Sequence, residues 1–98
     1  MSHPVYVLPA ARDDIAAAAA WYESRRPGLG AAFLRRVGEV LSRVEEQPLQ
    51  FPQVHETIRR GLTRRFQYAV YFLVMELRVE FLAVVHLHRH PDSWKRGR

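Results

Sequence analysis

The spacing of apolar residues along the chain changes from a helical period to a period of two after residue 51. Residues 4–8 are mostly apolar and predict a short opening strand. Two helical faces follow, formed by Ile15, Ala18, Ala19 and Tyr22 and then by Phe33, Leu34, Val37, Leu41 and Val44. Because only the Pro/Gly segment 27–30 separates them, they predict an antiparallel helical hairpin.

Charged residues indicate where the first helix starts and stops. Asp13 and Asp14 are predicted in its first turn, and Arg25 and Arg26 in its last turn. The carboxylates would then lie at the positive N-terminal end of the helix dipole and the arginines at its negative C-terminal end, which stabilises a helix.

Three strands are predicted in the second half of the chain. Residues 57–65 alternate with arginine on both faces, which is typical of an exposed or edge strand. Residues 68–75 are apolar on both faces, as expected of a central strand. After a turn at 76–78, residues 79–87 form a last strand, one face of which becomes polar toward its end.

These elements predict one α+β domain spanning residues 1–98. Its order is β-α-α-β-β-β: a short N-terminal strand, an antiparallel helical hairpin and a three-stranded antiparallel meander, with the hairpin packed on one sheet. Residues 90–98 form a basic tail that contains Trp94. We expect Trp94 to pack back on the sheet and to fix the path of the tail.

Composition excludes several classes of protein. The chain has no cysteine, so disulfides, thiolate catalysis and thiolate metal sites are excluded. No apolar run approaches the roughly 20 residues that a membrane span needs, and the first residues lack the pattern of a secretory signal. We therefore expect a cytoplasmic protein that does not associate with membranes.

The positive charge is concentrated in the second half of the chain. Of 15 basic residues, all but Lys95 are arginine, and the whole net charge of +5 lies in residues 51–98. Arginine suits carboxylates and phosphates because its planar fork donates two parallel hydrogen bonds. The bias indicates either an anionic partner, nucleic acid or an acidic protein segment, or simply a genome that favours arginine codons.

Few residues are placed for catalysis or metal binding. His86, His88 and His90 would point the same way on a strand, but no suitably placed carboxylate accompanies them, so we interpret them as solvated and expect no metal or other cofactor. No serine has the surroundings of a nucleophile. We interpret Trp21 and Tyr22 as core residues.

Arginine and histidine are the better candidates for a functional surface. Arg59, Arg60, Arg64 and Arg65 lie on one predicted strand, and His86, His88 and Arg89 end another. If the two strands are neighbours, these side chains converge at one end of the sheet. Such a patch could bind phosphate, stabilise charge during RNA cleavage, bind an acidic protein tail, or be a solvated edge.

Short stretches along nearly the whole chain form a specific pattern through their order and spacing. These are Ala11 to Asp14 with Ile15, Trp21-Tyr22-Glu23, Pro27 to Gly30 with Phe33-Leu34, Phe51-Pro52, Arg59-Arg60, Arg65 to Phe72, Ala83 to His86, Arg89, Pro91 and Trp94. With this pattern the sequence resembles the RelE/ParE superfamily of toxins from bacterial type II toxin–antitoxin modules. The resemblance implies the same fold as the periodicity.

The resemblance implies two possible activities. RelE-like members cleave messenger RNA in the ribosome, whereas ParE-like members, the plasmid-stabilisation type, poison DNA gyrase. RelE-type cleavage uses an arginine after the third-strand tyrosine and a tyrosine near the C-terminus. Here the first position holds Ala69. No tyrosine follows Tyr71, so the second group is absent, although Trp94 lies near its expected position. Arg89 does match a basic position of the nuclease branch.

The departures from the nuclease pattern favour a ParE-like toxin that binds DNA gyrase and is neutralised by an acidic, ParD-like antitoxin in a hetero-oligomer. The residues expected to bind antitoxin or target are Arg59, Arg60, Arg64, Arg65, Arg89 and Trp94. One alternative is a ribosome-dependent mRNA endonuclease that uses Arg64, Arg65, His86, His88 and Arg89. Another is a non-toxic remnant that binds only its antitoxin.

Overall fold

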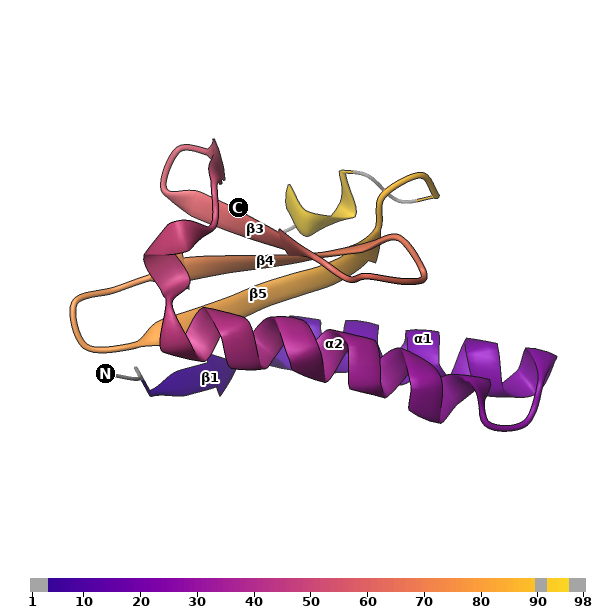
Figure 1. The fold of residues 1–98 in the computed structure, drawn as a ribbon. Helices are drawn as coiled ribbons and strands as arrows, with labels where there is room; N and C mark the ends of the chain where they lie inside the picture. Colours follow the sequence, from indigo (N-terminus) through magenta and orange to yellow (C-terminus); the bar gives the residue numbers. More distant parts are fainter. Residues whose placement is uncertain (1–3, 90–91, 96–98) are drawn as a thin grey trace.

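The structure, a computed structural model, describes residues 4–89 and 92–95 of the chain. Its elements are β1 (Val5–Val7), α1 (Pro9–Arg25), α2 (Leu29–Glu46), the 3₁₀ turn η1 (Pro48–Gln50), β2 (Gln53–His55), β3 (Ile58–Leu62), β4 (Tyr68–Val74), β5 (Val79–His86) and the 3₁₀ turn η2 (Ser93–Lys95). The two helices form an antiparallel hairpin along one sheet (Figure 1). The predicted α+β class and helical hairpin are therefore confirmed.

The sheet differs from the predicted three-stranded antiparallel meander. It has five strands in the order β1-β5-β4-β3-β2, and β1 runs parallel to β5 while the other pairs are antiparallel. The helical hairpin connects β1 to β2 at the opposite edge of the sheet, and β1 pairs with β5, the last strand of the chain. β2 was missed because its three residues are all exposed and show no apolar alternation.

The predicted edge strand at residues 57–65 is also corrected. β3 is shorter, Ile58–Leu62, and lies inside the sheet between β4 and β2. Arg64 and Arg65 therefore belong to the turn that follows β3.

The last strand, β5, ends at His86. The imidazole Nδ1 of His86 accepts hydrogen bonds from the backbone N–H groups of residues 88 and 89, both at 3.1 Å, and these bonds hold the turn that leads the chain away from the sheet.

β4 is apolar on both faces because both faces are covered, which confirms the prediction of a central strand. On the helix side, Val70, Phe72, Phe81 and Val84 pack with Phe33, Val37, Val40 and Val44 in one buried cluster. On the other side, Ala69, Tyr71, Ala83 and Val85 are buried in a second cluster with Ile58 and Trp94. The expected return of Trp94 to the sheet is confirmed: its ring stacks on that of Tyr71 at a centroid distance of 4.7 Å.

The turn between the helices is stabilised by a carboxylate from α1. Gly28 has a φ of +88°, a conformation that favours glycine. The Glu23 carboxylate accepts hydrogen bonds from the backbone N–H groups of Gly28 and Gly30, each at 3.0 Å. These N–H groups begin α2 and have no partner within the helix, so a negative side chain is favourable there.

The start of α1 is earlier than predicted, and this changes the role of its acidic residues. α1 begins at Pro9, so Asp13 and Asp14 lie beyond its first turn. Asp14 instead accepts a hydrogen bond from the backbone N–H of Val84 at 2.9 Å. Because β1 pairs with β5 only as far as Phe81, this N–H lies past the end of β1, and the carboxylate satisfies a strand donor that would otherwise lack a partner.

Gly61 allows α2 to pack closely on β3. A Cβ atom at this position would lie 2.8 Å from Cγ1 of Val40 and 3.1 Å from the ring of Phe51. Any larger residue would push α2 and the segment before β2 away from the sheet.

Candidate functional site

The candidate site lies at the end of the sheet where β4 begins and β5 ends. Tyr68 and His86 are register partners there, and their rings approach to a centroid distance of 5.3 Å. α1 adds Tyr22, whose ring lies 6.2 Å from that of Tyr68. The turn after β5 adds Arg89, so three separate segments of the chain meet at this point.

Arg89 joins these segments through its guanidinium. Its Nη2 donates hydrogen bonds to the hydroxyl oxygen of Tyr22 at 3.1 Å and to that of Tyr68 at 3.3 Å. Its Cζ also lies 4.8 Å from the ring centre of Trp21, within the range of a cation–π contact. The side chain of Arg89 is thus held by α1 and β4 although the residue itself is exposed.

Tyr68 is kept in its neutral form. Burial raises its pKa to about 12 from the ordinary value of 10, and the neighbouring Tyr22 phenol adds to the rise while Arg89 opposes it. A phenol with such a pKa is protonated at neutral pH and does not act as a general base there. Its role in the site is to accept the hydrogen bond from Arg89.

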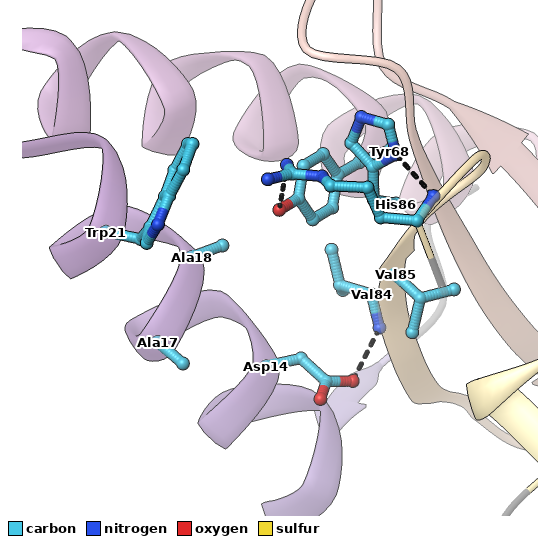
Figure 2. A pocket seen from close by; sticks show the side chains of 9 residues that line it. Asp14, Ala17, Ala18, Trp21, Tyr68, Val84, Val85 and His86 are labelled. Carbon is cyan, nitrogen blue, oxygen red and sulfur yellow. Dashed lines mark hydrogen bonds between the residues drawn. The ribbon is translucent and has the colours of Figure 1, made fainter. Parts of the chain in front are cut away.

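A cavity of about 300 Å³ opens between α1 and the last residues of β5. It is lined by Asp14, Ala17, Ala18, Trp21, Tyr68, Val84, Val85, His86 and Arg89. Figure 2 shows Asp14 on one side, bonded to the backbone of Val84, and Tyr68 and His86 on the other. The two alanines leave the space because their short side chains do not reach the sheet.

A second pocket, of about 600 Å³, lies on the other side of His86 and is strongly basic. Its lining residues are Tyr22, Arg25, Arg26, Leu29, Arg65, Phe66, Gln67 and His86. Three of these are arginines and none is a carboxylate. We call Arg25, Arg26 and Arg65 the arginine pocket.

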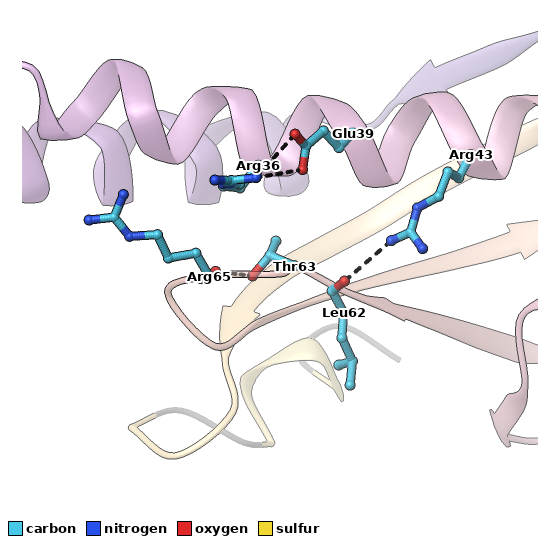
Figure 3. A network of polar contacts seen from close by, with 6 residues as sticks. All are labelled: Arg36, Glu39, Arg43, Leu62, Thr63 and Arg65. Carbon is cyan, nitrogen blue, oxygen red and sulfur yellow. Dashed lines mark hydrogen bonds and ion pairs between the residues drawn. The ribbon is translucent and has the colours of Figure 1, made fainter.

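The turn after β3 fixes the position of Arg65. The buried Thr63 hydroxyl donates to the backbone carbonyl of Arg65 and accepts from the N–H of Tyr68 at 3.1 Å. Phe66 and Gln67 both have positive φ values, 72° and 57°, which side chains rarely adopt. Figure 3 shows Arg65 extending from this turn beside α2, which also contacts β3 through Arg43. Such uncommon conformations persist where the surrounding structure holds them, and they concentrate at functional sites.

The structure places the predicted strand arginines apart from this site. Arg59 lies on the helix side of β3, where its Nη1 donates to the carbonyl oxygens of Phe51 at 2.6 Å and Leu49 at 3.3 Å. Arg60 lies opposite Tyr71, and its Nε is buried without a hydrogen-bond partner in the described part of the chain. The hydrogen bonds of Arg59 therefore hold β3 against the segment that precedes β2.

The other predicted residues are divided between several places. Arg64 lies in a groove against α2 with Gly38, Glu39, Ser42 and Arg43. Trp94 lies on the opposite face of the sheet from the site. Because β4 separates β3 from β5, the two predicted strands are not neighbours. Even so, the structure brings Arg65 and His86 into one pocket, with Arg89 beside them.

The histidines do not share one strand face as predicted, because β5 ends at His86 and His88 lies in the turn beyond it. His90 lies outside the described residues. Within residues 4–89 and 92–95, no three His, Cys, Asp or Glu side chains approach closely enough to hold a metal ion.

Several residues of the site were missed from sequence. Trp21 and Tyr22 were both interpreted as core; Tyr22 is buried, but Trp21 is 42% exposed and contacts both Arg25 and Arg89. An aromatic pair followed by two arginines within one helical turn was the available signal. Nothing local indicated the contact between Tyr22 and Arg89, which are 67 positions apart.

Comparison with known proteins gives a likeness of structure but none of sequence. No family model matches the chain, and no curated protein matches it. A solved structure described as the chromosomal ParDE TA system from P. aeruginosa contains a chain with a similar fold. The TM-score is 0.77 at 15% sequence identity, and the match covers 87% of this chain and 96% of that chain.

The likeness extends over nearly the whole of both chains. No helix in the described part of the chain is both long and apolar enough to cross a membrane. The extent of the structural match shows that this protein shares the fold of that chain of the ParDE system.

Proposed function

We propose that this protein is the toxin of a type II toxin–antitoxin module, that it acts by binding DNA gyrase, and that a ParD-like antitoxin neutralises it. The observation that carries the proposal is the similarity of fold to a chain of a ParDE system, which covers nearly all of both chains. The candidate site agrees with it, since a basic end surface and an exposed tryptophan are suited to protein binding.

The chain also departs from the pattern of RelE-type cleavage. Ala69 stands where the nuclease pattern has an arginine, and it is fully buried beneath the face that Trp94 covers. Tyr68 has a raised pKa and is held by Arg89, so it is a poor proton acceptor at neutral pH. These features favour binding over catalysis.

Expression without antitoxin tests the proposal. Induced cells should stop DNA replication and form filaments, while a reporter message continues to be translated at first. We expect no mRNA cleavage above background, because the chain lacks the arginine and the tyrosine of the nuclease pattern. Losing a charge-stabilising or proton-transferring group commonly lowers the rate by about two to four orders of magnitude. An immediate arrest of translation with intact replication would contradict it.

Binding of an antitoxin is tested separately by co-expression with the product of the neighbouring gene. The acidic partner should co-purify, raise the soluble yield and abolish growth inhibition. If the partner neither co-purifies nor protects cells, the proposal that the two genes form a toxin–antitoxin module is wrong. A chain that binds its partner but never inhibits growth would be the non-toxic remnant.

One observation favours the endonuclease as a second candidate. Arg65 and His86 line the same pocket, and Arg89 lies beside them, so three of the five residues of the nuclease hypothesis come together. Primer extension on ribosome-bound message tests it. Codon-phased cuts that appear within minutes and disappear in Arg89→Ala would establish cleavage, whereas uncut message in the wild type would exclude it.

A further inference from the structure

We propose that the arginine pocket binds the phosphate backbone of a nucleic acid, independently of base sequence. This goes beyond the proposed toxin function, because it assigns a direct nucleic-acid contact to Arg25, Arg26 and Arg65. The pocket combines side chains from the end of α1 and from the turn after β3, so it forms only in the folded chain.

The three guanidinium groups are available to a ligand. None of them forms an ion pair or a hydrogen bond within the part of the chain that the structure describes. Glu23, an acidic residue on the same helix, is engaged by the N–H groups of Gly28 and Gly30. The positive charge of the pocket is therefore not neutralised by a carboxylate among its lining residues.

Two of the arginines are also held in place by aromatic rings. The Cζ of Arg65 lies 4.8 Å from the ring centre of Phe66, and that of Arg25 lies 4.7 Å from the ring centre of Trp21. Arg89 contacts Trp21 as well and extends the basic surface past His86. Arginines fixed in this way lose less conformational freedom when they bind an anion.

The pocket is better suited to a polyanion than to an acidic peptide. Tyr22 is only 9% exposed and Leu29 and Phe66 are half-buried, whereas the three arginines of the pocket are exposed. A disordered peptide needs apolar burial to offset its ordering, and exposed ion pairs with carboxylates contribute little in water. Phosphates along a nucleic acid bind arginine with release of condensed counterions, which requires no apolar contact.

Fluorescence anisotropy with the whole chain tests the proposal. The probes are labelled single strands of DNA and RNA about 16 nucleotides long, with a labelled polyglutamate peptide of equal charge as comparison. Three phosphate contacts predict a slope of about −2 when the logarithm of the binding constant is plotted against that of the salt concentration between about 50 and 200 mM. The relative affinities of the DNA and RNA strands identify which of the two supplies the phosphates.

Single substitutions locate the binding. Arg25→Gln, Arg26→Gln and Arg65→Gln should each weaken binding about 3- to 10-fold and make the salt slope shallower by about 0.7, because each removes one phosphate contact. Arg35→Gln is the matched control: Arg35 is exposed on α2 and lies outside the pocket. Its change of affinity should be less than 2-fold. Circular dichroism and melting temperature confirm that each variant is folded.

Three results would overturn the proposal. The first is the absence of nucleic-acid binding by the folded wild type at about 50 mM salt. The second is a loss in Arg35→Gln as large as that in the pocket variants. The third is tighter binding of polyglutamate than of either nucleic acid, with the same dependence on Arg25, Arg26 and Arg65, which would make an acidic protein segment the ligand.

Discussion

Replacing Trp94 with alanine is expected to lower the free energy of unfolding by about 3 kcal/mol. Trp94 is 8% exposed, stacks on Tyr71 at 4.7 Å and contacts His55 at a ring distance of 5.4 Å. A buried aromatic side chain covers about 150–250 Å², and truncation of tryptophan in a core costs about 3–5 kcal/mol. Water can enter after truncation at this edge of the sheet, so the lower end of the range applies.

The structure provides a matched control in the other tryptophan of the chain. Trp21 is 42% exposed, and it contacts Arg25 and Arg89 as well as the edge of the Tyr22 ring. Trp21→Ala should therefore cost about 1 kcal/mol or less. Urea unfolding followed by circular dichroism measures both losses, and 3 kcal/mol corresponds to a fall in melting temperature of about 12–24 °C for a domain of this size.

The comparison of the two variants decides the result. If Trp94→Ala unfolds within about 1 kcal/mol of the wild type, the indole does not hold the second face of the sheet. If Trp21→Ala is the more destabilising of the two, the assignment of one tryptophan to the core and the other to the surface is wrong.

Three further predictions concern the site and its support. Arg89→Ala should relieve growth inhibition while lowering stability by only about 1–2 kcal/mol, the cost of its hydrogen bonds to Tyr22 and Tyr68; equal toxicity in the variant would remove Arg89 from the functional surface. Gly61→Ala should destabilise the fold by about 1–3 kcal/mol, measured by urea unfolding, because its Cβ would lie 2.8 Å from Val40. The raised pKa of Tyr68, about 12, favours the folded state below pH 10, and this contribution is lost as the pH rises through 12. It amounts to at most about 3 kcal/mol, and Tyr68→Phe should make the decline in stability between these pH values shallower.

The sequence predicted the elements whose environment is uniform along their length. α2 alternates apolar and polar residues at helical spacing because one of its faces packs on the sheet and the other faces solvent. β4 is apolar throughout because both of its faces are buried, and this identified it as the central strand.

The remaining features depend on contacts between distant segments. β1 pairs with β5 across more than seventy residues, and its three residues contain no signal for a parallel partner. β2 is exposed throughout, so its place in the sheet follows from backbone pairing with β3 alone. The prediction of β3 as an edge strand rested on its arginines, but Arg59 lies inside the fold because the carbonyl oxygens of Leu49 and Phe51 satisfy its guanidinium.

The candidate site was predicted in part for the same reason. Arg65, His86 and Arg89 were identified because basic residues clustered in sequence, and they lie at one end of the sheet. The contacts of Arg89 with Tyr22 and Trp21 require α1 to lie over that end of the sheet. The helical spacing of apolar residues does not specify where the helix lies on the sheet. Trp94 was predicted to pack on the sheet, and it does so on the face opposite the site.

A supercoiling assay with purified DNA gyrase tests the central claim most directly. The purified protein should inhibit supercoiling of relaxed plasmid in proportion to its concentration, and equimolar antitoxin should restore the activity. Arg89→Ala, folded to the same extent, should inhibit more weakly. Full supercoiling in the presence of excess folded protein, together with codon-phased cleavage of ribosome-bound message by the same preparation, would contradict the account.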